Sequence, residues 1–69
     1  MTKKEKRAIS RDLFRVELDL DMVIFKLNMM EEDLKESGER SLLLEIQKLR
    51  GALREQGGAL SLIRRRAER

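Results

Sequence analysis

The sequence predicts an all-α protein that folds as a single antiparallel two-helix hairpin, similar to a coiled coil. Three observations lead to this prediction. Apolar residues recur at alternating intervals of four and three in both halves of the 69-residue chain. Charged residues make up 42% and hydrophobic residues 41%, a mixture typical of helical bundles. The one convincing break between the periodic segments is a glycine-containing stretch at residues 37–40.

The first helix is expected over about residues 3–36. Thr2 and Glu5 have the spacing of a capping box, with Thr2 as the N-cap. Residues 16–22 alternate as a strand would, but a heptad seam runs through them and the chain has no second alternating segment to pair with, so a helix is predicted. The seam consists of Ile9, Leu13, Val16, Leu20, Val23, Leu27, Met30 and Leu34.

The second helix is expected over about residues 41–67, after a turn at 37–40. Gly38 suits the left-handed position that ends a helix, and Ser41 is the expected N-cap of the next helix. Because the second seam keeps its phase across Gly57 and Gly58, one continuous helix is favoured over two short ones. This seam consists of Leu42, Ile46, Leu49, Leu53, Gln56, Leu60, Ile63 and Ala67.

Some polar and small residues of the second helix allow two interpretations. Gln56 either fixes the register of its seam or lies at the edge of the seam and reaches water. Gly51 and Gly58 lie roughly opposite the seam, where they either admit another backbone or are simply tolerated on an exposed face.

A second apolar set lies about 180° from the seam of the first helix. It consists of Phe14, Leu18, Met22, Phe25 and Met29. The rest of the short chain can bury only one face of this helix, so the other face needs a partner. We therefore expect the hairpin to be completed by homodimerisation into a four-helix bundle or by docking to another helical protein.

Folding the chain about Gly38 brings both termini to one end and separates the charges into two poles. The loop end is the acidic pole, with Glu31, Glu32, Asp33, Glu36, Glu39 and Glu45. The basic pole consists of Lys3, Lys4, Lys6, Arg7, Arg11, Arg64, Arg65, Arg66 and Arg69. Such a pole suits the phosphates of RNA or DNA, orients the hairpin against a charged protein, or is only a solvated end.

The sequence carries no pattern typical of an enzyme. It has no His, no Cys and no phosphate-binding glycine loop. Asp19 and Asp21 are two residues apart, so on a helix they point to different sides and do not form a metal pair. We therefore expect no catalytic residues, no cofactor, no metal and no small-molecule substrate. No apolar segment is long enough to span a membrane, and a cytoplasmic location is expected.

The central part of the chain, residues 30–53, resembles the small two-helix co-chaperones of type III secretion needle subunits. The similarity covers about a third of the chain. It implies that the hairpin pairs with a larger helical-repeat chaperone and keeps a needle subunit unpolymerised. The arginine-rich C-terminus departs from the pattern of that family. The residues that carry the similarity are Glu32-Asp33-Leu34, Gly38 and Leu42-Leu43-Leu44-Glu45.

The first helix also resembles that of the plasmid-encoded Rop proteins. The similarity implies a dimeric four-helix bundle that binds paired RNA loops, with Lys3, Phe14 and Lys26 on the RNA face. The later part of the match needs a shift of one residue, and the second helix shows no such similarity. The residues that carry it are Met1-Thr2-Lys3, Glu5-Lys6, Ala8, Phe14 and Lys26-Leu27-Asn28.

The expected function is that of a small non-enzymatic adaptor or co-chaperone. Its protein-binding residues would be those of the second apolar set of the first helix. The alternative is a dimeric regulator that binds RNA or DNA through the basic pole. The two hypotheses differ in which substitutions abolish binding: Phe25→Asp in the first, and neutral replacements at the basic pole in the second.

Overall fold

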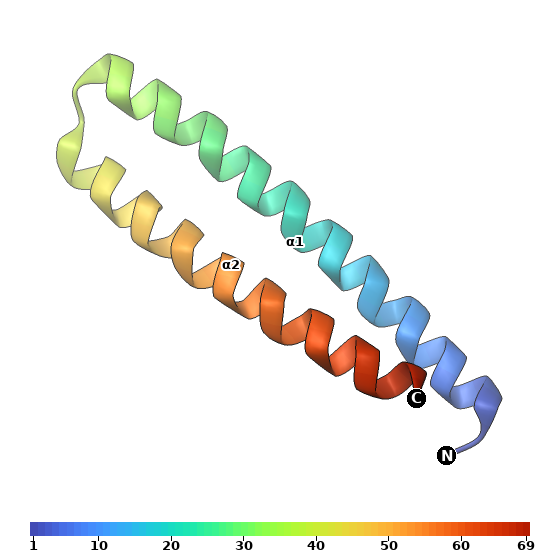
Figure 1. Cartoon of the computed structure of the whole chain (residues 1–69). Helices are drawn as coiled ribbons and strands as arrows, with labels where there is room; N and C mark the ends of the chain where they lie inside the picture. Colours follow the sequence, from blue (N-terminus) through green and yellow to red (C-terminus); the bar gives the residue numbers. More distant parts are fainter.

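The chain forms two long helices that lie side by side in opposite directions. The computed structural model describes all residues from 1 to 69, and it contains no strand. Helix α1 spans Lys3–Ser37 and helix α2 spans Arg40–Glu68. Together they form a rod whose Cα atoms extend over 53 × 15 × 10 Å (Figure 1). The expected all-α hairpin is therefore confirmed, and each helix boundary lies within one residue of the expected one.

Helix α1 begins with the expected cap. The backbone of Thr2 is extended, and its Oγ1 accepts a hydrogen bond from the backbone N–H of Glu5 at 3.2 Å. The hydroxyl of Thr2 also donates to Oε1 of Glu5 at 3.1 Å. In a full capping box the Glu5 carboxylate would instead accept from the backbone N–H of Thr2. The helix then continues without interruption through residues 16–22, where the sequence alternates as a strand would.

The turn between the helices is two residues long and depends on Gly38. This residue has φ 76° and ψ 15°, the left-handed conformation that glycine adopts without a steric penalty. The N–H of Glu39 then reaches the carbonyl of Leu34 at 3.1 Å, which satisfies the end of α1. The prediction that Ser41 caps α2 is wrong. The N-cap is Glu39, whose carbonyl already accepts the N–H of Leu43, so Ser41 lies inside the first turn.

Helix α2 is continuous through its glycine pair, as the unbroken phase of its seam favoured. Gly57 faces α1, and a Cβ atom added to it would lie 3.3 Å from Cδ2 of Leu20. Added Cβ atoms at Gly51 and Gly58 would meet nothing within 4 Å. The glycine that allows the two helices to approach closely is therefore Gly57, whereas Gly51 and Gly58 lie on an open face.

Only half of each apolar seam lies between the helices. We call the residues of that half the inner row. Its members are buried or half-buried. They are Leu13, Leu20, Leu27 and Leu34 on α1, and Ile46, Leu53, Leu60 and Ala67 on α2.

The other half of each seam is exposed and forms what we call the flank row. Its apolar members are 41% to 54% accessible to solvent. Gln56 is exposed as well, which agrees with its interpretation as an edge residue. The flank row consists of Ile9, Val16, Val23 and Met30 on α1, and Leu42, Leu49, Gln56 and Ile63 on α2.

A row with several polar residues takes the place of the flank row in the contact between the helices. We call it the bridging row, and all of its members are buried or half-buried. Only two residues of the chain are buried, Leu27 and the bridging residue Glu31. The hairpin alone therefore forms a narrow, unfinished core. The bridging row consists of Ser10, Glu17, Ile24 and Glu31 on α1, and Leu43, Arg50, Gly57 and Arg64 on α2.

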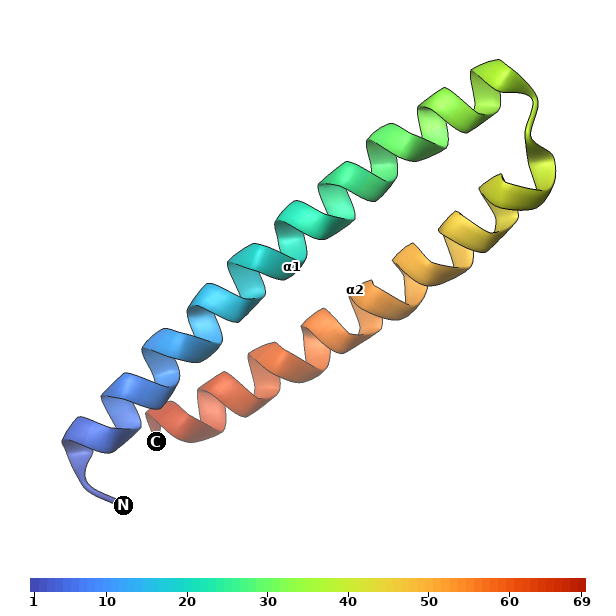
Figure 2. The same ribbon diagram turned by 180° about the vertical axis from the view of Figure 1, so that it is seen from behind.

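Both chain termini lie at the same end of the rod, as the reverse view in Figure 2 shows. Ser10 Oγ donates to Oε1 of Glu68 at 2.9 Å, and Lys6 Nζ donates to the carbonyl of Arg69 at 3.4 Å. Helix α1 therefore extends past the end of α2 by about two turns. Neither helix has an apolar stretch long enough to cross a membrane.

Candidate functional site

The second apolar set of α1 lies on the outside of the hairpin. Its five side chains are 48% to 63% exposed, and Phe25 is the most exposed of them. A shallow hollow of about 580 Å³ runs over four of the five, and Asp21 and Lys26 complete its lining. We call these four residues the Phe–Met face. They are Leu18, Met22, Phe25 and Met29.

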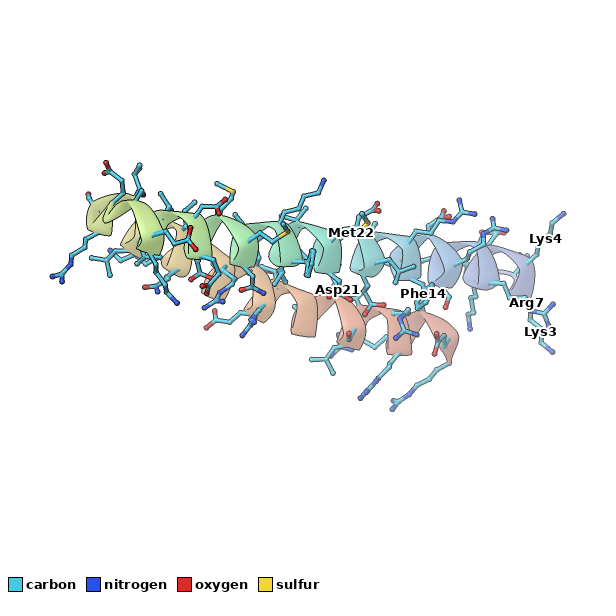
Figure 3. The ribbon with its side chains drawn as sticks, turned by 90° about the horizontal axis from the view of Figure 1, so that it is seen from above. Lys3, Lys4, Arg7, Phe14, Asp21 and Met22 are labelled. Atoms are coloured by element: carbon cyan, nitrogen blue, oxygen red, sulfur yellow. The ribbon has the colours of Figure 1, made fainter.

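Phe14 is separated from the rest of the set. The guanidinium carbon of Arg64 lies 5.6 Å from the centroid of the Phe14 ring, a cation–π distance. In Figure 3, Phe14 lies beside the last turns of α2. It also lines the grooves along the junction of the two helices. The structure thus brings four of the five predicted protein-binding residues into one surface and places Phe14 at its border with α2.

Charges of opposite sign flank the Phe–Met face along α1. Arg11 and Arg15 lie one heptad before Leu18 and Met22, and Glu32 and Glu36 lie one heptad after the last two members of the face. All four charged side chains are exposed. A helix that docks on this face therefore meets cations at one end and carboxylates at the other.

Ion pairs of the bridging row fix which side of α1 faces outward. Arg64 Nε lies 2.6 Å from Oε2 of Glu17, and Ser61 donates a hydrogen bond to the same carboxylate. Arg50 Nη1 lies 2.7 Å from Oε2 of Glu31 and also donates to Oδ1 of Asn28. These contacts hold one side of α1 against α2, so the Phe–Met face remains directed to solvent.

The same contacts change the acidity of two groups. The hydrogen bond from Ser61, together with the hydrogen bond and positive charge of Arg64, lowers the pKa of Glu17 below its ordinary value of 4.5, against the opposing effect of burial. The hydrogen bond to Glu17 and its negative charge, with Glu68 adding to both, raise the pKa of Arg64 above its ordinary value. Glu17 is therefore ionised and Arg64 protonated across the neutral pH range.

A cleft of about 620 Å³ opens at the basic pole, between the overhanging start of α1 and the end of α2. Lys3, Lys4 and Arg7 project from this free end of the rod in Figure 3. Six of the nine predicted residues of the pole line the cleft, whereas Lys4, Arg65 and Arg66 do not. The six are Lys3, Lys6, Arg7, Arg11, Arg64 and Arg69.

Not all of these cations are available to an anionic ligand. Arg64 pairs with Glu17 at 2.6 Å and with Glu68 at 3.0 Å, so its charge is compensated within the hairpin. Arg11 lies 3.9 Å from Asp12, a long contact between two exposed side chains. Lys3 and Arg7 line the cleft without an ion pair. The cleft therefore presents fewer available cations than the sequence suggested.

Sequence reasoning missed the bridging row. Its acidic members, Glu17 and Glu31, are 14 residues apart in α1, and its arginines, Arg50 and Arg64, are 14 apart in α2. Both spacings are two heptads, so each pair lies on one helix face, directly beside the apolar seam. That shared phase is the signal from which the interhelical ion pairs were predictable.

Comparisons with known proteins add no relative: no protein-family model matches the chain, and no curated protein or solved structure is significantly similar to it.

Proposed function

We propose that this protein is a small non-enzymatic adaptor that binds a helix of another protein on its Phe–Met face. The observation that supports this proposal is the exposure of four large apolar side chains around one hollow of a helix whose opposite side is fixed by ion pairs. Burying such side chains contributes about 1.5 to 3 kcal/mol each before entropic costs. Contiguous exposed apolar patches, when large, mark sites of interaction with other proteins.

The partner that suits this surface is an amphipathic helix. Methionine side chains are flexible and adapt to the shape of a docked apolar surface, and helix-in-groove recognition uses apolar residues at helical spacing. The partner helix would carry carboxylates near Arg11 and Arg15 and basic residues near Glu32 and Glu36. A co-chaperone role, in which the hairpin covers the apolar face of a helical subunit, is one form of this activity.

Site-specific photo-crosslinking tests the proposal. A photoreactive amino acid replaces Phe25 in one variant and Leu62 in a control, because Leu62 is 60% exposed and lies on the outer side of α2. We expect a discrete protein adduct from position 25 in cells of the source organism and none from position 62. The captured protein is then identified by mass spectrometry, and its affinity is measured by calorimetry against the chain and against Phe25→Asp and Leu62→Asp.

The two aspartate variants decide the outcome of this experiment. Both introduce one negative charge at an exposed apolar position, so a general effect of charge on the hairpin is the same in each. The proposal requires that Phe25→Asp loses the affinity and that Leu62→Asp retains it. Equal adducts from both positions, no adduct from either, or equal affinities of the two variants would contradict it.

A second candidate function is the binding of RNA or DNA at the basic pole, which the cleft lined by Lys3, Arg7 and Arg11 favours. Phosphate groups bind such a cluster through charge, so the affinity falls steeply with added salt. Because Arg64 is held by Glu17, replacing it would disturb the helix contact and is not a clean test.

The cleaner test compares two triple variants that remove the same total charge. Lys3, Arg7 and Arg11 are changed to Gln in the first, and Arg40, Lys48 and Arg54, which lie outside the cleft, in the second. Fluorescence anisotropy with an RNA stem-loop and a DNA duplex is measured over a salt series. Loss of binding in the first variant alone would support this function. Equal loss in both variants would mean that only net charge matters.

A further inference from the structure

We propose that the flank row is the interface with a second copy of this chain, which packs in the opposite direction so that each loop lies beside the partner's termini. The inference goes beyond the proposed function and does not depend on it, because it concerns a different face of the hairpin. The flank row is exposed on both helices, and its residues follow one another in a regular order along the rod.

The flank row of both helices lies on one side of the hairpin. Each of its residues precedes a member of the bridging row, and bridging residues of α1 face those of α2. Because Glu17 faces Arg64, Val16 lies in the same layer as Ile63. Because Glu31 faces Arg50, Met30 lies in the same layer as Leu49.

The other side of the helix contact is different in character. A groove of about 380 Å³ runs along it. Four of the residues that line the groove, Phe14, Asp21, Arg54 and Ser61, each follow a member of the inner row by one position. The residues one position after the inner row therefore lie on this mixed polar side of the helix contact. The residues one position before the bridging row, which form the flank row, lie on the opposite side. That opposite side is the apolar one.

The layers of the flank row are symmetric about their centre. The layer of Val23 and Gln56 lies midway between the layer of Val16 with Ile63 and the layer of Met30 with Leu49. A two-fold axis through the central layer, perpendicular to the helices, superimposes each outer layer on the other. Val16 then meets Met30 of the partner subunit, Val23 meets its own copy, and Leu49 meets Ile63 of the partner subunit.

This register gives a role to the polar residue of the seam. Gln56 is the one polar member of the flank row, and it falls on the two-fold axis. A glutamine side chain both donates and accepts, so two copies that face each other can form reciprocal hydrogen bonds. A polar residue at such a position fixes register and orientation in helical bundles. If the loops instead lay at the same end, each Gln56 would face the apolar Val23 of the partner subunit.

Charges beside the flank row favour the same arrangement. The residues three positions after each flank residue border the interface on its outer edge. With the loops at opposite ends, Asp19 faces Lys26 of the partner subunit and Glu45 faces Arg66 of the partner subunit, and each pair occurs twice by symmetry. Ala52 faces Ala59 of the partner subunit and allows the helices to approach closely.

One pair on this edge is unfavourable, because Asp12 faces Asp33 of the partner subunit. The attraction between the oppositely charged poles of the two chains is larger than the repulsion of this one pair. With the loops at opposite ends, the basic pole of each chain lies over the acidic pole of the other, whereas loops at the same end would place like poles together. Electrostatic complementarity of this kind selects orientation. With the loops at the same end, the outer edge would contain one favourable pair, Asp12 with Arg66 of the partner subunit. It would also contain one unfavourable pair, Asp33 with Glu45 of the partner subunit.

The size of the face suits a stable dimer. The backbone of the hairpin covers 53 × 15 Å, which is the scale of the roughly 800 Å² that each protein contributes to an interface of standard size. The inner row, of which only Leu27 is buried within a single hairpin, would become the centre of a four-helix bundle. The Phe–Met face of each copy points away from this interface, so the dimer would present two partner-binding surfaces.

Sedimentation equilibrium of the purified chain over a dilution series is the first test. We expect a mass of twice 8.1 kDa that dissociates only on strong dilution. Val23→Asp is expected to reduce the mass to that of a single chain. Phe25→Asp is the matched control, because it introduces the same charge at an exposed apolar position of α1, and it is expected to remain dimeric. A single-chain mass for the unmodified protein at all concentrations, or loss of the dimer in Phe25→Asp alone, would overturn the proposal.

Single cysteines test the register without relying on a destabilising variant, and the chain contains no cysteine of its own. Gln56→Cys and Val23→Cys are each expected to form a disulfide with their own copy under mild oxidation. Leu49→Cys and Ile63→Cys are expected to cross-link mainly when mixed. Leu62→Cys, on the outer side of α2, is the control and is expected to stay reduced.

The cross-linking pattern distinguishes the arrangements. Cross-links between Val23→Cys and Gln56→Cys in a mixture, without self-cross-links of either, would show loops at the same end and overturn the proposed orientation. Cross-linking of Leu62→Cys as fast as of Gln56→Cys would show random collision and overturn the interface. The dimer and the Phe–Met adaptor function can fail separately, because their variants lie on different faces.

Discussion

Arg64 Nε lies 2.6 Å from Oε2 of Glu17, and this contact joins the last turns of α2 to the first half of α1. Ser61 donates to the same carboxylate, and Arg64 Nη1 reaches Glu68 at 3.0 Å. Two heptads away, Arg50 and Glu31 form a second pair at 2.7 Å. The two pairs lie between the helices at the positions that an apolar residue would occupy in a simple coiled coil. They determine how each helix is rotated about its own axis, and therefore which apolar residues remain outside.

The first prediction concerns the pH dependence of stability. The pKa of Glu17 is lowered in the folded chain, chiefly by the hydrogen bond from Ser61. The carboxylate therefore contributes stability above its ordinary pKa of 4.5, and this contribution is lost as the pH falls through the lower, folded pKa. Glu17→Gln is expected to be less stable than the unmodified chain at pH 7 and to lose less stability below pH 4.5. Urea unfolding at a series of pH values and one protein concentration measures both effects.

Glu55→Gln serves as the control for this experiment, because Glu55 is exposed and forms no ion pair or side-chain hydrogen bond. It is expected to keep the pH profile of the unmodified chain. An unchanged acid slope in Glu17→Gln would mean that another carboxylate is responsible for the loss of stability in acid.

The second prediction concerns the pair of Glu31 and Arg50. The side chain of Glu31 is only 5% exposed, so removing its partner leaves a buried charge without compensation. Arg50→Ala is expected to lower the free energy of unfolding by about 2 kcal/mol, less than for a fully buried pair because Arg50 is 28% exposed. Replacing both residues by Leu is expected to restore the stability or exceed it. A double-mutant cycle that combines Glu31→Leu, Arg50→Leu and the double variant, measured by thermal and urea unfolding, would show this coupling, and additive losses would exclude it.

The third prediction concerns the turn. Gly38 has φ 76°, and a residue with a Cβ atom pays roughly 1 to 2 kcal/mol to adopt that conformation. Gly38→Ala is therefore expected to lower the free energy of unfolding by about 1 kcal/mol, and Gly38→Asn by less, because asparagine tolerates this region better. Gly51→Ala, at an open helical position, is expected to change stability in the opposite direction. Stabilisation by both alanine substitutions would mean that the turn changes its conformation without a cost in free energy.

The fourth prediction compares the two adjacent glycines of α2. Gly58→Ala is expected to raise the free energy of unfolding by about 1 kcal/mol, because alanine has the higher helix propensity and the new methyl group meets nothing. Gly57→Ala is expected to gain less, since its methyl group would lie 3.3 Å from Leu20 and force that side chain to move. Gly57→Leu is expected to be destabilised by about 1 to 3 kcal/mol through overpacking. Equal stabilities of the two alanine variants would show that the Leu20 side chain moves aside without a cost in free energy.

Much of the fold was predictable because its signals are local. Thr2 caps a helix through a hydrogen bond to a residue three positions away, and Gly38 ends one through its own backbone conformation. The heptad spacing identified both helices and located their short connection, from which the antiparallel arrangement follows. The predicted N-cap at Ser41 was wrong because a two-residue turn starts α2 earlier than a serine-capped helix would.

The candidate site was predictable in composition but not in full arrangement. The exposed face of α1 was expected from its second apolar set, and four of its five residues do share one hollow. The separation of Phe14 depends on Arg64, which is 50 positions away in the sequence. Likewise, the number of available cations at the basic pole depends on which arginines meet carboxylates of the other helix.

The sequence by itself determined the two helices, their antiparallel order and the set of apolar positions along each of them. Only the tertiary structure decided that half of each seam lies between the helices and that the other half, with Val23 and Gln56 at its centre, faces outward. The physical reason is that periodicity records a residue's place on its own helix, which hydrogen bonds between near neighbours fix. The rotation of one helix against another depends on contacts between distant residues, here the pairs of Glu17 with Arg64 and Glu31 with Arg50.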